Sequence, residues 1–390
     1  MLSSRLKLTF ALLISGFTLL SAQSIDVKVG DESIKITPMG RFYIDGATFI
    51  EDETDMSNGV SLTDLRLGLK AKYQKFDVKV DIGFAGGKVG AKDIFLQYNL
   101  GRSSYIRGGH FAEPFGIDHM ESSANIKFIT ANASSFAFSP GRKLGAEFIG
   151  WNKYMWVGAG VFGDGDAINS SIEGDDGYSA TGRLVFNPIQ QEGKIFHIGL
   201  AGSYRKADAN GYDADGEQKA KVIGYSSSLI SNVDKRKFLN ASISNADYQA
   251  KYAVELIGAY GPMHFQGEYF HSNVKRKDDL PSYMASGAYA QVGFLAIGGN
   301  YTYSASWARL AAPKPKSLEF ALRYNYTDLD NEHSGIKGGR MSDWSFAANY
   351  YLNKYVMFRL NYSNVSLGNN NPLGADENIN SIQARLQVVF

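Results

Sequence analysis

The chain has 390 residues, no cysteine and a formal net charge of +1, with 42 glycines, 23 tyrosines, 24 phenylalanines and only nine prolines. The many aromatic residues exclude a disordered chain, and the near-neutral charge argues against a nucleic-acid-binding protein. Because cysteine is absent, disulfides, thiolate metal sites and a cysteine nucleophile are excluded. No stretch beyond the N-terminus is apolar for long enough to form a membrane-spanning helix.

Residues 1–22 are typical of a secretory signal peptide. Arg5 and Lys7 precede an apolar run at 8–20, and Ala22 supplies the small residue needed for cleavage. The apolar run has 13 residues, whereas a membrane anchor needs about 20. The predicted mature domain therefore covers residues 23–390 and has a net charge near −1.

The remaining sequence is predicted to be all-β. Apolar residues recur at every second position, as in Phe76-Asp77-Val78-Lys79-Val80-Asp81-Ile82. Such alternation gives each strand one apolar and one polar face. A soluble β-sandwich also alternates in this way, so the pattern by itself leaves sandwich and barrel open.

The spacing of turns favours a barrel. Short and long connections alternate along the chain, with two exceptions, a brief link at 86–90 and an extended one at 298–315. The tight connections are expected near 74–75, 101–102, 152–153, 187–194, 261–262 and 353–354, and the long ones at 51–60, 111–141, 164–177, 206–246, 275–283, 329–340 and 367–379. This alternation predicts a 16-stranded antiparallel transmembrane β-barrel with both termini on the short-turn side.

Aromatic residues support a location in the outer membrane. Several lie near predicted strand ends, where they would form interfacial girdles. The chain ends on Phe390, the last residue of an alternating strand. A terminal aromatic residue is similar to the signal of proteins inserted by the bacterial outer-membrane assembly machinery, which is an expected partner together with outer-membrane lipids. The predicted location is the outer membrane of a Gram-negative bacterium.

A group of short motifs resembles the phosphate-selective porin O and P family. The motifs are Gly109-His110-Phe111-Ala112-Glu113-Pro114-Phe115-Gly116-Ile117, Gln266-Gly267-Glu268-Tyr269, Asn349-Tyr350-Tyr351-Leu352-Asn353 and Arg385-Leu386-Gln387-Val388-Val389-Phe390. The resemblance implies a homotrimeric porin with an inward-folded third loop that narrows the pore, and with basic residues that select phosphate in some members.

The third loop is expected at 111–141. It contains five phenylalanines, too many for a freely solvated loop, and they could be buried by folding back into the barrel. The predicted pore-constricting and anion-contacting residues are Lys127, Arg142, Lys143, Arg107, Arg41 and Arg66. The acidic residues Glu113, Asp118 and Glu121 in the same loop reduce its positive charge, so the residues indicate a preference for anions rather than a dedicated phosphate filter.

Two further loops carry charge runs. In the loop at 206–246, an external basic funnel is predicted from Lys219, Lys221, Lys235, Arg236 and Lys237, although five acidic residues also allow a merely solvated loop. The acidic loop at 164–177 lacks the ligand spacing of an EF-hand, which favours a solvated loop over a calcium site.

The predicted function is passive diffusion of small hydrophilic solutes, with possible preference for anions such as phosphate. The scattered histidines and the lack of a nucleophile elbow, P-loop or dinucleotide motif indicate that the chain is not an enzyme and needs no cofactor or metal. The alternatives are a non-conducting barrel that serves adhesion through its long loops, a secreted soluble β-protein and, as a further possibility, an outer-membrane barrel enzyme.

Overall fold

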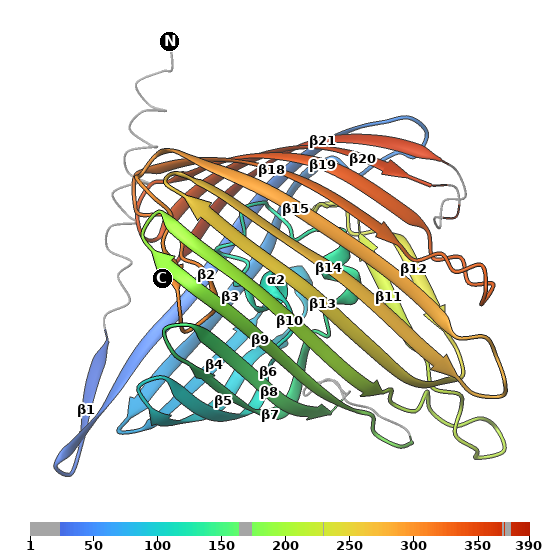
Figure 1. The fold of residues 1–390 in the computed structure, drawn as a ribbon, viewed down its shortest axis with the longest axis horizontal. Helices are drawn as coiled ribbons and strands as arrows, with labels where there is room; N and C mark the ends of the chain where they lie inside the picture. Colours follow the sequence, from blue (N-terminus) through green and yellow to red (C-terminus); the bar gives the residue numbers. More distant parts are fainter. Residues whose placement is uncertain (1–23, 164–173, 229, 369, 371–375) are drawn as a thin grey trace.

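The computed structural model describes residues 24–163, 174–228, 230–368, 370 and 376–390. Most of the chain forms one antiparallel sheet of seventeen strands, and pairing of its first long strand with its last strand closes the sheet into a barrel (Figure 1). The predicted all-β, 16-stranded antiparallel barrel is thereby confirmed. The predicted signal peptide lies outside the described residues.

The first nine barrel strands lie between residues 32 and 206. They are β2 (Glu32–Glu51), β3 (Gly59–Tyr73), β4 (Phe76–Gly83), β5 (Gly90–Gly101), β6 (Ser104–Ala112), β7 (Arg142–Trp151), β8 (Met155–Gly163), β9 (Tyr178–Gln191) and β10 (Lys194–Lys206). The other seven are β13 (Ala246–Tyr260), β14 (Met263–Arg276), β15 (Tyr283–Ile297), β18 (Ser317–Asp328), β19 (Arg340–Tyr351), β20 (Val356–Leu367) and β21 (Glu377–Val389).

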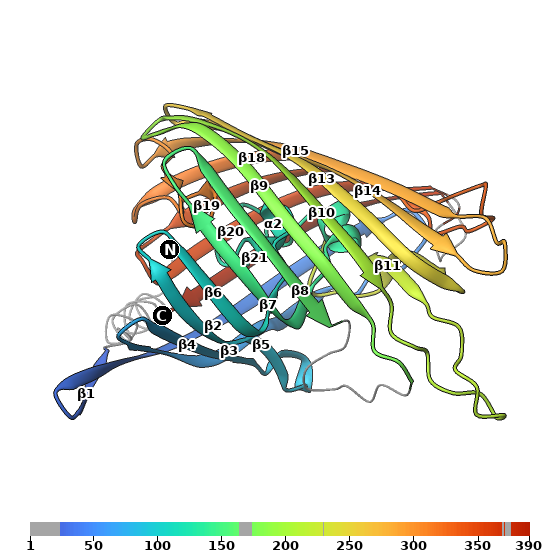
Figure 2. The same cartoon turned by 60° about the horizontal axis from the view of Figure 1, so that its bottom comes forward.

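Short turns gather at one rim and long links at the other, as the sequence predicts (Figures 1 and 2). The fourth tight connection differs from the prediction, because β9 continues to Gln191 and only Glu192 and Gly193 form the turn. Pro188 cannot donate a ladder hydrogen bond, and it falls in a stretch where the register with β10 shifts. The proline therefore marks a bulge rather than the end of the strand.

An additional strand, β1 (Ile25–Val29), was not predicted. It pairs with the beginning of β2 and forms a hairpin that extends beyond the barrel on the short-turn side (Figure 1). The alternation of β1 resembles that of the barrel strands, but both of its faces are exposed.

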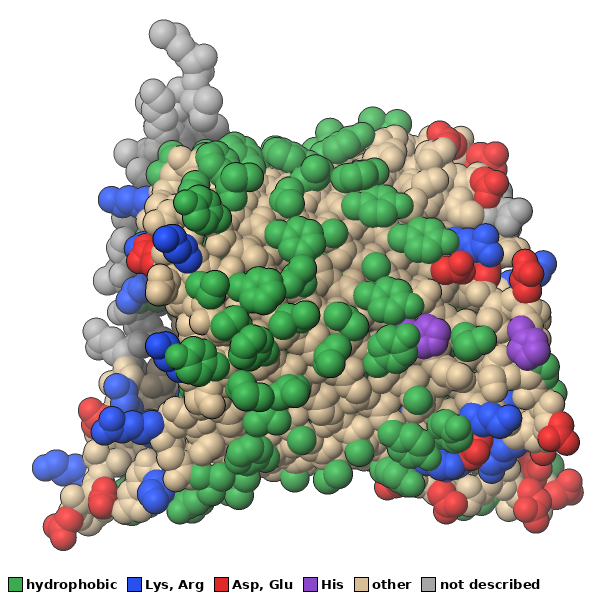
Figure 3. All heavy atoms as spheres, in the orientation of Figure 1, with side chains coloured by type: hydrophobic (Ala, Val, Ile, Leu, Met, Phe, Trp, Pro, Cys, Tyr) green, Lys and Arg blue, Asp and Glu red, His purple; other side chains and the backbone are tan. Residues whose placement is uncertain are grey.

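The side chains follow the predicted division between the two faces of the wall. Along β10 the exposed Phe196, Ile198 and Leu200 alternate with the buried His197 and Ala201. Figure 3 shows hydrophobic side chains across the wall, with charged side chains concentrated at its two edges. Among the described residues, no helix is long and apolar enough to cross a membrane.

The C-terminal residue takes part in closing the sheet. The backbone N–H of Gly40 donates to the carbonyl of Phe390, and the N–H of Phe390 donates to the carbonyl of Gly40, each at 2.9 Å. The Phe390 ring lies over Gly40, where a Cβ atom would approach its Cζ atom to 2.5 Å. The last residue of the chain therefore pairs directly with the first long strand.

Gly68 permits a close approach of β3 and β4 in the wall that lines the pore. A Cβ at this position would clash with the backbone carbonyl of Val80, whereas a Cβ at Gly46 would come no closer than 3.8 Å to another atom.

We expect Gly68→Ala to destabilise the barrel by about 1–3 kcal/mol because the backbone must move. The temperature at which the folded band is lost on an SDS gel should fall for Gly68→Ala and stay constant for the control Gly46→Ala. Equal melting of the two variants would contradict this account.

Candidate functional site

The inner wall formed by β2, β3 and β4 carries pairs of like charges on adjacent strands. Arg41 lies opposite Arg66, and Lys70 lies opposite Lys79. Facing like charges repel, so neighbouring carboxylates are needed to hold such an arrangement. This wall therefore combines many basic groups with carboxylates in fixed positions.

The two arginines share a pair of aspartates. Arg66 Nε lies 2.8 Å from Asp64, and Arg41 Nε lies 3.6 Å from the same carboxylate. Both guanidinium groups also lie 3.8 Å from Asp81. The cluster is neutral as a whole, so it fixes the two guanidinium groups and adds little net charge to the pore.

The segment 113–141, which contains α2 (Ile117–Met120) and α3 (Ala133–Phe138), contacts inward-facing side chains. Arg359 donates to the carbonyls of Phe128 and Ala124, each at 2.9 Å, and Asn349 donates to the carbonyl of Lys127 at 2.8 Å. Both views show α2 within the outline of the barrel (Figures 1 and 2). These bonds attach the segment to β19 and β20, more than 200 residues later in the chain.

Other bonds attach the same segment to β10 and β14. Glu268 accepts hydrogen bonds from the backbone N–H groups of Ile117 at 2.6 Å and Asp118 at 3.1 Å. Glu113 accepts from Arg205 at 2.6 Å, and both side chains are buried. The segment thus bridges separate parts of the wall and has few ways to move as a unit.

A second link enters from the short-turn side. Residues 298–316, with β16 (Tyr303–Ser304) and β17 (Arg309–Leu310), contribute the Ala308 carbonyl to Arg183 at 3.0 Å and the Ser306 carbonyl to the indole N–H of Trp156 at 3.1 Å. Arg309 forms an ion pair with Glu121 of the segment 113–141. The two links therefore meet inside the barrel.

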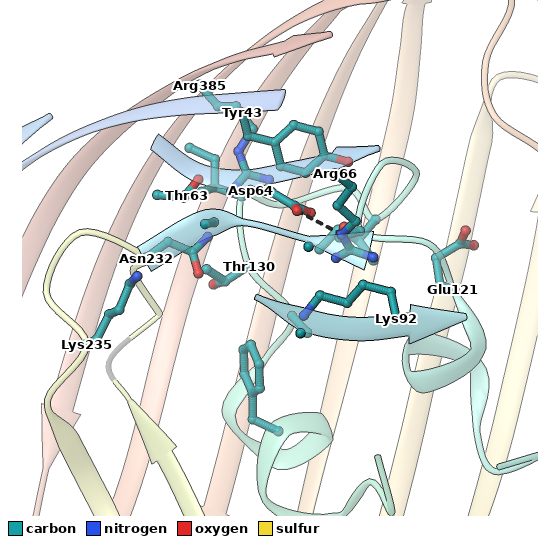
Figure 4. A pocket seen from close by; sticks show the side chains of 18 of the residues that line it. Tyr43, Thr63, Asp64, Arg66, Lys92, Glu121, Thr130, Asn232, Lys235 and Arg385 are labelled. Carbon is teal, nitrogen blue, oxygen red and sulfur yellow. Dashed lines mark hydrogen bonds and ion pairs between the residues drawn. The ribbon is translucent and has the colours of Figure 1, made fainter. Parts of the chain in front are cut away.

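Two cavities of about 860 and 720 Å³ lie between the wall β2–β5 and these links. Arg66 and Glu121 line both cavities, which places these two side chains where the cavities adjoin. Figure 4 shows Arg66 of β3, Lys92 of β5 and Lys235 of another link around the first cavity, and β4 lies between the two wall strands. The lining of the second cavity has nine basic side chains and four acidic ones, so its charge favours anions.

The basic groups with the greatest freedom to act on solutes are lysines. Within the described part of the chain, six lysines that line one or other cavity have no side-chain ion pair with a carboxylate: Lys35, Lys70, Lys72, Lys88, Lys92 and Lys235. Most of the lining arginines, in contrast, are paired with a carboxylate. Lys88, Lys92 and Arg309 were missed by the sequence analysis, because they lie in or beside links whose inward course leaves no periodic signal.

The predicted constriction residues occupy different environments. Arg41 and Arg66 line the cavities as described, and Arg41 also donates to Ser123 of the segment at 3.0 Å. Arg142 lines the second cavity and lies 2.8 Å from Asp93. Lys127 is buried, lies 3.0 Å from Glu319, and lines neither cavity.

The two remaining predicted residues also differ. Arg107 lines the second cavity but is paired with Glu147 at 2.6 Å and lies over the Phe111 ring at 4.2 Å. Lys143 is half-buried, pairs with Phe111 across the sheet, and does not line either cavity. Their roles in anion contact stay predictions.

The link of the predicted basic funnel partly folds inward. Its hairpin β11 (Ile223–Ser228) and β12 (Lys237–Ile243) packs against the wall, and Tyr225 accepts a hydrogen bond from Gln249 at 2.7 Å. Lys235 faces the first cavity, whereas Arg236 pairs with Asp234 at 2.7 Å. Lys219 and Lys237 are exposed and Lys221 is half-buried, so the five residues do not share one surface. The calcium alternative falls largely on 164–173, outside the described residues.

His119 of the segment 113–141 lines the second cavity, and its protonation state depends on the charges and the burial there. Burial, together with the nearby positive charges of Arg142 and Lys251, lowers the pKa of the imidazole to about 3. The side chain is therefore neutral in the folded barrel at pH 5 to 8, although it would gain a proton below about 6.5 when unfolded.

We expect His119→Gln to leave the pH dependence of anion-to-cation permeability unchanged between pH 8 and pH 5, because no charge is lost. The measurement is a reversal potential in a salt gradient at each pH. A rise in anion preference near pH 6 that is present in the wild type and absent in His119→Gln would contradict the depressed pKa.

The chain is similar to proteins of known family and fold. The family model described as phosphate-selective porin O and P matches residues 39–390. Porin O of Pseudomonas aeruginosa is 23% identical over 321 residues, which cover 73% of this chain and 70% of the relative.

Solved structures show the same fold at low identity. An anion-selective porin from Comamonas acidovorans is 10% identical, with a TM-score of 0.58 over 92% of this chain and 100% of that chain. OmpT of Vibrio cholerae in its trimer form is 11% identical, with a TM-score of 0.56 over 92% of this chain and 99% of that chain.

Proposed function

We propose that this chain, which belongs to the phosphate-selective porin O and P family, forms a water-filled outer-membrane channel in which small hydrophilic solutes diffuse with a preference for anions. The observation that carries the proposal is the set of lysines that line the two cavities and, among the described residues, have no ion pair with a carboxylate. Their ammonium groups attract anions and exclude cations at a narrow, water-filled passage.

The segment 113–141 is the proposed constriction. Its bonds to β10, β14, β19 and β20 hold it across the barrel, and its Glu121, like Arg66 of the wall, lines both cavities. A fixed obstruction narrows the passage without closing it, which suits diffusion of small solutes. Phosphate is the favoured anion on the strength of the family, since lysine can bind phosphate as a point charge and release it.

The remaining features of the proposal concern export and assembly. We propose cleavage of residues 1–22 on export, insertion by the outer-membrane assembly machinery through the strand that ends at Phe390, and assembly into a homotrimer. Support comes from the apolar run at 8–20, from the pairing of Phe390 with Gly40, and from the fold shared with an outer membrane protein solved in a trimer form. Proteins of this family are channels, and we propose no enzymatic activity for this chain.

The purified mature protein should conduct when it is reconstituted into a planar bilayer. Deletion of residues 119–137 should raise single-channel conductance because it removes the middle of the proposed constriction. A folded protein without conductance would overturn the porin proposal and would favour the closed barrel that serves adhesion.

Selectivity should depend on the cavity lysines. The double variant Lys70→Gln/Lys72→Gln should lower the anion-to-cation permeability ratio severalfold, measured as a reversal potential in a salt gradient. Arg142→Gln/Lys143→Gln should lower the ratio less, because Asp93 already offsets the charge of Arg142.

The matched control is Lys219→Gln/Lys237→Gln, which removes two exposed charges away from both cavities. An equal loss of selectivity in the control would show that net charge, and not placement in the pore, sets the preference. Repeating the measurement in phosphate instead of chloride determines whether phosphate is preferred.

A further inference from the structure

Basic residues recur at the short-turn rim of the barrel. Five of the seven turns that join barrel strands on this side carry at least one exposed basic side chain, and a sixth is followed directly by Lys194, the exposed first residue of β10. The set, here called the turn collar, comprises Lys75, Arg102, Lys153, Lys194, Lys314, Lys316 and Lys354. The one acidic residue among these turns is Glu192, which lies 3.2 Å from Lys314. The turn rim of the barrel therefore has a strong positive charge.

The opposite rim has the reverse balance. Its described links carry more acidic than basic residues, among them Asp52, Glu53 and Asp55 in one link and Asp213, Asp215 and Glu217 in another. Figure 3 shows blue side chains predominating along the edge near the termini and red ones gathered at the other edge. The net charge of the whole chain is therefore near zero, although positive charge predominates at the short-turn rim and negative charge at the opposite rim.

Three collar lysines lie against tyrosine rings of the rim. Lys354 Nζ is 4.6 Å from the centre of the Tyr355 ring, Lys153 Nζ is 5.2 Å from Tyr154, and Lys75 Nζ is 5.9 Å from Tyr98. Tyr98 follows the exposed Leu96 by two residues on β5, so its ring belongs to the face that meets lipid. Tyrosine rings of this kind mark the membrane interface.

The contacts with the tyrosine rings determine how deep the lysine ammonium groups lie relative to the membrane. A lysine stem lies along apolar surface while its charge reaches toward water, so an ammonium group beside an interfacial tyrosine lies at the level of lipid headgroups. Within the described ranges, Lys75, Lys153 and Lys354 have no side-chain ion pair with a carboxylate. Their charge is therefore available to a phosphate outside the barrel wall.

We propose that the turn collar binds the phosphate groups of anionic glycerophospholipids in the leaflet that faces the short turns. A single lysine near an anionic membrane surface strengthens association by about fivefold. The collar residues lie in five turns and at the start of β10, so their charges are spaced around the barrel. Such spacing suits separate headgroups rather than a single bound ion. The collar is distinct from the cavity lysines, which line the lumen.

The test uses the full mature protein in phosphatidylcholine vesicles with spin-labelled phosphatidylglycerol or spin-labelled phosphatidylcholine. The wild type should associate with phosphatidylglycerol several times more strongly. The variant Lys75→Gln/Lys153→Gln/Lys354→Gln should lose most of this preference, and the corresponding arginine variant should retain it. The control Lys219→Gln/Lys221→Gln/Lys237→Gln removes the same charge from the other rim and should retain it as well.

Several outcomes would overturn the proposal: equal association of the two lipids with the wild type, an unchanged preference in the collar variant, or the same loss in the control. Inorganic phosphate, compared with chloride at equal ionic strength, should not displace the lipid, and displacement would assign the collar to free phosphate instead. Single-channel conductance of each variant verifies folding. A fall in ion selectivity without a change in lipid association would assign the collar to permeating anions.

Discussion

Closure of the sheet is the constraint on which the rest of the structure depends. In the hydrocarbon of a membrane an unpaired backbone N–H or carbonyl costs several kcal/mol, so the first and last strands must pair. Pairing of β2 with β21, completed by the bonds between Gly40 and Phe390, meets this requirement. Once the sheet is closed, period-two alternation forces every second side chain into the lumen, and the charges of the pore follow from the same pattern that makes the outer face apolar.

The charged side chains that point into the lumen and are buried there need partners of opposite charge. Arg183 with Glu255, Arg107 with Glu147 and Arg385 with Asp45 are buried pairs at 2.6–2.8 Å. Removing one member of such a pair would leave an uncompensated charge, which costs more than the pair itself contributes. Arginine in this barrel therefore serves mainly to hold the wall and the links together, whereas six of the described lysines line the cavities without such a partner.

The sequence predicted the strands well because alternation and turn chemistry are local. It could not predict the path of the links at 207–245 and 298–316, because their inward course is determined by contacts with residues far away in the chain, such as Arg183 and Gln249. For the same reason Lys127 was predicted as a pore residue although it is buried beside Glu319, and Arg309 was missed although it meets Glu121. The β1 hairpin was missed because its five residues are too short a stretch for periodicity to be informative.

The bonds of the segment 113–141 also order events during folding. Their partners Arg323, Asn349 and Arg359 belong to strands near the C-terminus, so the segment can be locked in place only after nearly the whole chain has joined the sheet. Contacts between residues this distant form slowly, since the intervening chain must first be ordered. The segment 113–141, the proposed constriction, is therefore one of the last parts of the molecule to acquire its shape. If it sets the width of the channel, an incompletely closed barrel would be wider and less selective.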